Sequence, residues 1–236
     1  MRFKSNSLDL HIHDGHNSSI LISDSHSGKV LFAANEERYT RQKNQGGFPI
    51  NAIKKSQDFL DYKLGDIKNV YFSTRTIPFN VSHTQYNFFR ELFIFLGLFL
   101  PVKFFSSKPI TKIYLILSSF LRKKQAINNL NKFGLKNKSI QFYDHHYCHA
   151  ASSLGFSENS NKKEMLIFTL DASGDAKSGS VSIFKSEKFK PIETIHTVDS
   201  LGEIYSQVTA LLKMKPMEHE YKLMGLAPYC KKEFAQ

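Results

Sequence analysis

The chain has 236 residues, enough for one large domain or two smaller ones with a hydrophobic core. Its 41% hydrophobic and 22% charged residues are typical of a globular protein and argue against a disordered or fibrous one. The net charge of +11 raises the question of nucleic-acid binding, but the basic residues are spread out and lack the interleaved aromatic pattern of single-strand binding surfaces. We therefore expect no nucleic-acid partner, and a solvated basic face that attracts small anions.

The location of the protein is predicted from three features of the sequence. The start of the chain has no signal-peptide pattern, and the two cysteines, Cys148 and Cys230, allow at most one disulfide. The most apolar stretch, residues 88–105, has eleven uncharged residues between Glu91 and Lys103, whereas a membrane span needs about 20. We expect a buried helix there, no membrane contact and a cytoplasmic location.

The first third of the chain predicts strands joined by polar turns. Apolar residues alternate along two short runs, Asp14-Gly15 marks the turn between them, and two further extended runs follow (residues 8–12, 20–22, 28–37 and 67–74). Between the last two runs, Ile50, Ile53 and Phe59 recur at helical spacing, with Pro49 near the start of the predicted helix and Gly65 past its end. A helical insertion over about residues 85–135 comes next.

The second half of the chain predicts a short strand, a histidine-bearing helix and a hairpin. The hairpin, residues 164–185, has a polar turn with glycine and repeats the strand–turn–strand plan of residues 10–22. Ser200, with Glu203 three residues later, predicts the start of a further helix.

Two hairpins that each open a lobe predict a duplicated, ribonuclease-H-like α/β fold of the actin-like ATPase class, with mixed sheets flanked by helices. The first lobe would span residues 1–160 and the second residues 161–236. A hairpin and about one helix are too little to cover both faces of a sheet, so the second lobe is expected to be incomplete. We favour a fragment over completion by another chain.

The segment DHHYCHAASS is the first candidate site. His145 and His149 are four residues apart, so on a helix they project from one face and can share a metal ion. His146 and His149 form an alternative pair, and Asp144 could be a further ligand or orient a histidine. The competing interpretation is a polar helix start with hydrogen-bonded histidines.

Two acidic or histidine-bearing turns are further candidates. In DASGDAKSGS, Asp171 and Asp175 flank Gly174, and carboxylates beside small residues can hold a cation that bridges to a phosphate. In HDGHNSS, His13 and His16 could act as a base or as phosphate donors near neutral pH. An ordinary turn would use the same residue types.

Two charged segments complete the set. NEERYTRQKNQ gathers Arg38, Arg41 and Lys43, which could bind an anionic substrate or simply cover a solvated helix start. EYKLMGLAPY places Glu220 and Lys222 before a turn expected at Gly225 and is uninformative alone.

Taken in order, six motifs resemble those of the O-carbamoyltransferases of antibiotic and nodulation-factor biosynthesis: IHDGHNSSILI, EERYTRQKNQGGFP, DHHYCHAASS, LDASGD, SLGEIYSQVT and EYKLMGLAPY. The resemblance runs from about Leu10 to Tyr229. It implies an actin-like, threonylcarbamoyl-transferase-like N-terminal domain. A separate domain would make carbamoyl-adenylate from ATP and carbamoyl phosphate, and this domain would pass the carbamoyl group to a hydroxyl of a sugar-like acceptor.

The resemblance also implies roles for single residues. His145 and His149 would be ligands of a divalent metal, with iron as the expected ion, and His13 or His16 would lie near the reacting hydroxyl. Lys43 would contact substrate or nucleotide, acting with the catalytic histidines. The residues assigned to the nucleotide are Asp171, Ser173, Gly174, Asp175, Glu220 and Lys222.

The sequence departs from the family pattern in three respects. Ala172 stands where the family turn has glycine, Cys230 stands where glycine commonly follows APY, and the adenylate-forming domain is missing. That domain is expected in the same or a neighbouring chain, and a homodimer is a further expectation. The alternatives are an inactive nucleotide-binding or interaction module of the same fold and, less favoured, a metal-dependent hydrolase built on His145 and His149.

Overall fold

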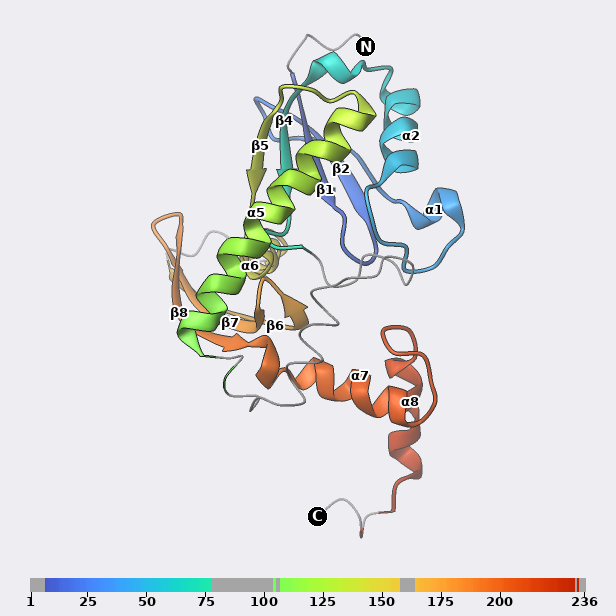
Figure 1. Cartoon of the computed structure of the whole chain (residues 1–236), viewed down its shortest axis with the longest axis vertical. Coiled ribbons are helices and arrows are strands. Elements are labelled where there is room, and N and C mark those ends of the chain that lie inside the picture. The colour runs from blue at the N-terminus through green and yellow to red at the C-terminus, as the bar shows by residue number, and fades with distance from the viewer. Residues whose placement is uncertain (1–6, 78–103, 105–106, 158–163, 232, 234–236) are drawn as a thin grey trace. The chain divides into compact units, whose positions relative to one another are not determined.

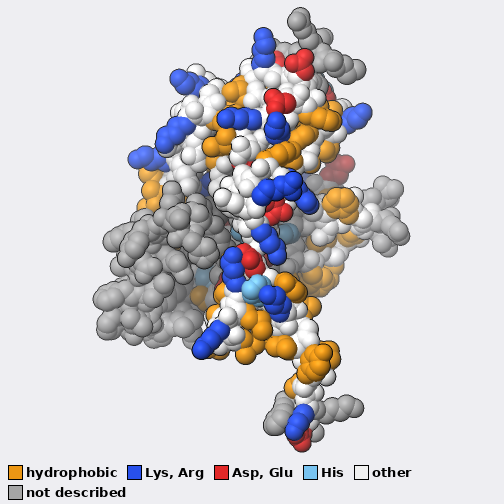
Figure 2. Space-filling view, turned by 90° about the vertical axis from the view of Figure 1, so that its right-hand side faces the viewer, with side chains coloured by type: hydrophobic (Ala, Val, Ile, Leu, Met, Phe, Trp, Pro, Cys, Tyr) orange, Lys and Arg blue, Asp and Glu red, His pale blue; other side chains and the backbone are white. Residues whose placement is uncertain are grey.

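The computed structural model describes residues 7–77, 104, 107–157, 164–231 and 233. The chain forms two compact units, Met1–Lys162 and Lys163–Gln236, and each is described by itself. Figure 1 labels their helices and strands. Lys and Arg side chains are spread over the face shown in Figure 2, with hydrophobic side chains between them.

A five-stranded mixed sheet forms the centre of the first unit. The strand order is β3-β2-β1-β4-β5, in which β1 pairs with β2, and β2 with β3, in antiparallel fashion, whereas β4 is parallel to both β1 and β5. The strands are β1 (Leu8–His13), β2 (Ser19–Asp24), β3 (Val30–Asn35), β4 (Ile67–Phe72) and β5 (Ser139–Phe142). The predicted strands and the predicted α/β class, with a mixed sheet flanked by helices, are confirmed.

The described helices of this unit are α1 (Glu37–Thr40), α2 (Ile50–Leu60), η1 (Leu64–Asp66), α5 (Lys108–Phe133) and α6 (His145–Gly155). The first part of the expected helical insertion, and most of the apolar stretch 88–105, lie outside the described residues. Within the described ranges, no helix has the length and apolar character needed to cross a bilayer.

The helix predicted between Pro49 and Gly65 is confirmed, and it ends before the glycine. Helix α2 ends at Leu60, and Asp61 adopts a left-handed conformation (φ 51°) in which its N–H donates to the Gln57 carbonyl. Aspartate tolerates this conformation better than most residues, so it ends the helix without a glycine.

One face of the sheet packs against helices α2 and α5. Leu8, Leu10 and Ile12 alternate along β1 with more polar positions, and all three are buried. They join one hydrophobic cluster with Ala52 and Ile53 of α2 and with Ala126 and Leu130 of α5. The alternation that predicted the strand therefore also determines which side of the sheet the helices cover.

A buried ion pair joins the β1–β2 turn to helix α5. Arg122 donates from both terminal nitrogens to the Asp14 carboxylate, at 2.8 and 2.5 Å, and the two residues are only 0% and 5% exposed. The guanidinium carbon also lies 4.7 Å from the centre of the Phe72 ring and 5.8 Å from that of Phe142. The pair therefore connects the turn, the helix and the ends of β4 and β5.

The second unit is a three-stranded antiparallel meander followed by helices. Its elements are β6 (Glu164–Gly174), β7 (Lys177–Lys185), β8 (Lys188–His196), η2 (Thr197–Asp199), α7 (Leu201–Leu211), α8 (Glu220–Leu226) and η3 (Ala227–Tyr229). The predicted hairpin is confirmed, and so is the predicted cap, because Ser200 Oγ accepts from the Glu203 N–H at 3.1 Å. The turn expected at Gly225 is wrong: this glycine lies inside α8.

Helix α7 packs closely against β6 at a glycine. A Cβ atom on Gly202 would lie 2.8 Å from Ala172 Cα, so only glycine fits without a shift of the backbone. Beside this contact, Ser200 Oγ donates to the Ala172 carbonyl at 2.7 Å. The Ser200 hydrogen bond thus holds the start of α7 against β6, and the absence of a side chain at Gly202 allows the two elements to approach this closely.

Breaking the buried ion pair tests its contribution to stability. The substitution Asp14→Asn leaves the Arg122 charge buried and uncompensated, so we expect the free energy of unfolding to fall by about 3–5 kcal/mol. The matched control is Asp58→Asn, which removes the exposed Lys55–Asp58 pair and should change it by less than about 1 kcal/mol. Urea titration measures both; equal losses would contradict a special role for the buried pair.

Two glycine substitutions test the packing of α7. Gly202→Ala should lower the free energy of unfolding by about 1–3 kcal/mol, because the added methyl group meets backbone. Gly225→Ala, at a helical position with open space around it, should raise it by about 0.5–1 kcal/mol. Thermal melts of the two variants should move in opposite directions, and a shift of both in the same direction would contradict this account.

Candidate functional site

The side chain of His13 is fixed by two hydrogen bonds at the end of β1. Its Nδ1 lies 2.7 Å from Ser73 Oγ, and its Nε2 lies 3.0 Å from the His16 carbonyl oxygen. A carbonyl oxygen only accepts, so Nε2 carries the proton and Nδ1 accepts from the Ser73 hydroxyl. These partners assign one neutral tautomer.

The surroundings of His13 also lower its pKa. Burial is the main cause, and the hydrogen bond to the His16 carbonyl and the nearby Asp14 carboxylate offset it only in part. A histidine with a lowered pKa is neutral at pH 7 and can accept a proton. His16 is less constrained: its Nε2 accepts from Asn17 Nδ2 at 2.9 Å. Of the two predicted histidines, His13 has the surroundings of a base.

Ser73 is a site residue that the sequence analysis missed. It directly follows β4, and its N–H donates to the Ile12 carbonyl at 3.2 Å. Because β4 is parallel to β1, the carboxyl ends of the two strands lie at one edge of the sheet, where α/β proteins commonly bind ligands. The polar end of the extended run at residues 67–74, which includes Ser73, was the available indication.

The helix α6 begins at the same edge. Asp144 follows β5 by two residues, and its Oδ1 accepts from the Tyr147 N–H at 3.1 Å, which caps the helix. His145, the first helical residue, has its ring centre 6.3 Å from that of His13. The structure thus brings together residues that are more than 130 positions apart in the sequence.

His145 and His149 are placed to act as a pair. Their Nε2 atoms are 3.0 Å apart, and His146 is only 1% exposed within the fold. The geometry therefore favours the pair four residues apart over the alternative of His146 with His149. Two imidazole nitrogens at this separation suit one ion bound at about 2.0–2.1 Å from each, and equally suit a hydrogen bond between two neutral rings. The donor set fits a divalent metal, which would take its remaining ligands from elsewhere.

The loop that carries Lys43 contacts the histidine turn through its backbone. The Ser18 N–H donates to the Gln45 carbonyl at 2.8 Å, and the Gly47 N–H donates to the Asp14 carbonyl at 3.1 Å. Lys43 itself is exposed. The segment is thus tied to the turn that holds His13.

The predicted phosphate loop of the second unit is a tight β-hairpin turn. Asp175 and Ala176 occupy the turn with φ angles of 51° and 65°, and Gly174 pairs with Lys177. The Asp171 carboxylate accepts from the Ala172 N–H at 2.6 Å, and Ser173 Oγ lies 3.4 Å from Thr197 Oγ1. The loop therefore brings the assigned polar groups to one end of the hairpin.

A second carboxylate, Glu203, lies near Asp171. Burial raises the pKa of Glu203, and the Asp171 charge raises it further. The sequence analysis recognised this glutamate only as part of a helix cap. A carboxylate whose pKa is raised by a neighbouring carboxylate is an arrangement that a bound cation can relieve.

Glu220 and Lys222 differ in how they are held. Burial raises the pKa of Glu220, but hydrogen bonds outweigh it and the net shift is downward: Oε1 accepts from the Met217 N–H at 2.6 Å and from Ser206 Oγ at 3.1 Å. This carboxylate therefore joins α7 to the start of α8. Lys222 is exposed, with its ammonium 5.9 Å from the centre of the Tyr221 ring.

Comparison with known proteins gives one family and several relatives. Residues 8–235 match the family described as Carbamoyltransferase N-terminus. The chain is 30% identical over 230 residues to the nodulation protein NolNO of Sinorhizobium fredii, covering 95% of this chain and 29% of that protein. An uncharacterized protein of Methanocaldococcus jannaschii is 30% identical over 223 residues, covering 93% and 33%. The chain thus spans about a third of the length of these relatives.

Among solved structures, the chain is similar to YeaZ from Pseudomonas aeruginosa. The TM-score is 0.37 at 9% identity, and the match covers 79% of this chain and 64% of that one.

Metal analysis tests the histidine pair. The double substitution His145→Ala with His149→Ala should lower the metal bound per purified chain to background, because both imidazole ligands are then lost. The control is His26→Ala, an exposed histidine in the β2–β3 turn. Elemental analysis by mass spectrometry gives the readout, and unchanged metal in the double variant would remove the assignment.

Proposed function

The chain belongs to the family of carbamoyltransferase N-terminal domains, and from that premise we propose that it transfers a carbamoyl group from carbamoyl-adenylate to a hydroxyl of a sugar-like acceptor. The observation that carries the proposal is the neutral, hydrogen-bonded His13 beside the His145–His149 pair at one edge of the sheet. A base whose ring centre lies 6.3 Å from that of a candidate metal ligand suits the transfer of a carbamoyl group from one oxygen atom to another.

The donor would be made elsewhere. In the proposal, ATP and carbamoyl phosphate give carbamoyl-adenylate in an adenylate-forming domain, in the same longer protein or in a partner chain. The present chain would bind the adenylate and the acceptor. This division of labour is compatible with a chain that spans about a third of its relatives.

His13 and Ser73 supply a route for the proton. The acceptor hydroxyl oxygen attacks the carbamoyl carbon, and the bond from that carbon to the phosphate oxygen breaks, releasing AMP. The hydroxyl proton passes to Ser73 Oγ while the Ser73 proton moves to His13 Nδ1, which already accepts from it at 2.7 Å. The Nε2–H bond to the His16 carbonyl holds the ring in place and stabilises the imidazolium that forms.

The remaining assigned residues would bind the two substrates. His145 and His149 would hold a divalent ion, with iron expected, which when bound supplies positive charge near the phosphate of the leaving group. The turn from Asp171 to Asp175 and the exposed Lys222 would contact the nucleotide. Glu220 would act mainly by holding the start of α8, because its carboxylate already accepts two hydrogen bonds.

A transfer assay on the full-length parent, or on this chain mixed with its adenylate-forming domain, tests the proposal. With ATP, carbamoyl phosphate and a panel of sugar acceptors, mass spectrometry should detect a carbamoylated acceptor. His13→Gln should lower the rate by about 10²–10⁴-fold, because the amide cannot take up the proton. Ser73→Ala should give a smaller loss, because the acceptor can then approach Nδ1 directly.

The control for this assay is His26→Gln, which should leave the rate unchanged. Full activity in His13→Gln would contradict the assigned base. No transfer to any acceptor, with adenylate formation intact, would instead favour the alternative of a nucleotide-binding module without catalysis. Ala172, which stands where the family pattern has glycine, favours the alternative of a non-catalytic module.

A further inference from the structure

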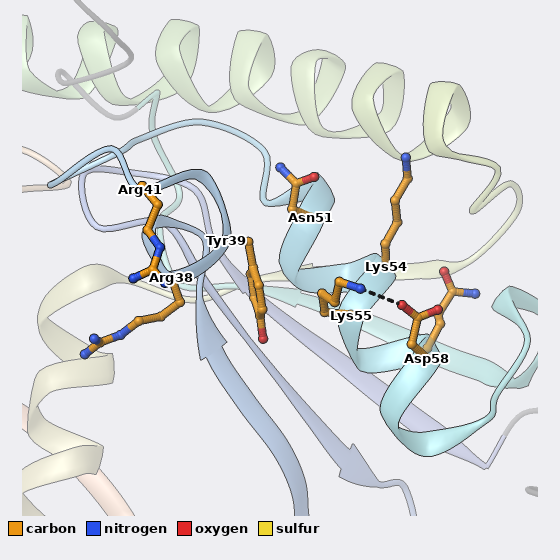
Figure 3. Close-up of a pocket in the computed structure, with 8 residues that line it drawn as sticks. Arg38, Tyr39, Arg41, Asn51, Lys54, Lys55 and Asp58 are labelled. Atoms are coloured by element: carbon orange, nitrogen blue, oxygen red, sulfur yellow. Dashed lines mark hydrogen bonds and ion pairs between the residues drawn. The ribbon is translucent and has the colours of Figure 1, made fainter.

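A basic groove in the first unit has no role in the proposed transfer. It is an open groove of about 660 Å³ between α1 with its C-terminal cap and one side of α2. Figure 3 shows Arg38 and Arg41 on one side and Lys54 and Lys55 on the other, with the Tyr39 ring between them. Four cations thus line one groove, and Asp58 is the only carboxylate among its lining residues.

The carboxylates around the groove are already occupied. The buried Glu36 accepts from the N–H groups of Asn51 and Ala52, at 3.0 and 2.7 Å, and so caps the start of α2. Glu37 accepts from the Asn44 N–H at 3.0 Å, and Asp58 accepts from Lys55 at 3.1 Å. Among the residues that line the groove, only Lys55 is therefore paired with a carboxylate.

Three of the four cations are available to a ligand. In the part of the chain that the structure describes, neither Arg38, Arg41 nor Lys54 makes an ion pair with a carboxylate, and all three side chains are exposed. Like charges held close together repel unless an anion lies between them. The groove is therefore arranged for a ligand with more than one negative charge.

The backbone fixes the arginine side of the groove. Arg41 has a left-handed conformation (φ 61°), and its N–H donates to the Glu37 carbonyl at 2.9 Å. Non-glycine residues adopt this conformation at a cost, which here the hydrogen bond offsets. The lysine side is fixed by Glu36, which directly precedes α1. Its carboxylate accepts hydrogen bonds from Asn51 and Ala52 at the start of α2. The elements that carry the two sets of cations are thus joined to each other.

We propose that this groove binds a small molecule that carries a diphosphate next to a sugar or base ring. Arginine guanidinium groups bind phosphate oxygens in pairs, and Lys54 adds a point charge from the other side. The Tyr39 ring, 37% exposed, gives a flat apolar surface on which a ring can stack. A free nucleotide and a nucleotide-linked sugar share this chemistry, and the site needs neither His13 nor the histidine pair.

Binding to the full chain, followed by the NMR shifts of amides 37–58, tests the proposal with three probes: inorganic pyrophosphate, ADP and UDP-glucose. All three should shift these amides. The variant Arg38→Gln with Arg41→Gln should weaken each probe by about tenfold or more, because two charged hydrogen-bonding groups are lost. Tyr39→Ala should weaken ADP and UDP-glucose but leave pyrophosphate unchanged. Tighter binding of UDP-glucose than of ADP would identify the linked sugar as the ligand, and the reverse order the free nucleotide.

The matched control removes two exposed cations elsewhere in the same unit, by Lys29→Gln with Lys68→Gln. It lowers the net charge equally and should change each affinity by less than about twofold, since distant surface charges are screened by salt. Equal weakening in control and arginine variant, or no shift of amides 37–58 with any probe, would overturn the proposal. Metal content and carbamoyl transfer are measured separately. A failed binding test of the groove would therefore not contradict the proposed transfer, and a failed transfer assay would not contradict binding in the groove.

Discussion

The buried pair of Asp14 and Arg122 is the interaction on which the first unit depends most. Two opposite charges buried away from water need hydrogen bonds to each other to offset their lost hydration, and here two such bonds join the guanidinium to the carboxylate. The aspartate directly follows His13 in the chain, so the position of the imidazole follows from where α5 holds its arginine. Phe72 and Phe142, which pack against the guanidinium, end the two strands that precede Ser73 and the histidine helix. One ion pair thus helps to set the relative positions of His13, Ser73 and the metal-ligand candidates.

The same unit uses a second buried carboxylate in a related way. Glu36 lies between a short helix and the start of α2, and its two oxygens accept backbone and amide hydrogen bonds instead of pairing with a cation. Because both oxygens of Glu36 point to the start of α2, this carboxylate stabilises the helix start and makes no ion pair with the neighbouring arginines in the described residues.

The sequence predicted those features that depend on near neighbours. Alternating residues indicated the strands, and the four-residue spacing of His145 and His149 indicated a shared helical face, because both patterns act within a few positions. Arg122 and Ser73 were missed as partners of Asp14 and His13, because the contacts join residues 108 and 60 positions apart and follow from the order of strands. Gly225 was misassigned to a turn because a single glycine costs a helix only about 1 kcal/mol, which neighbouring hydrogen bonds can offset. The roles of the site residues in the reaction remain predictions, since they depend on chemistry rather than on packing.

The hairpin of the second unit has a consequence for how that unit folds. Its two turn residues, Asp175 and Ala176, both need left-handed backbone, and alanine has no side-chain group to favour it. The turn is held instead by a later segment, since the Thr197 N–H donates to the Ala176 carbonyl. We therefore expect the turn between β6 and β7 to form only after β8 has paired with β7. In this unit the contacts between distant residues would thus form before the tight turn.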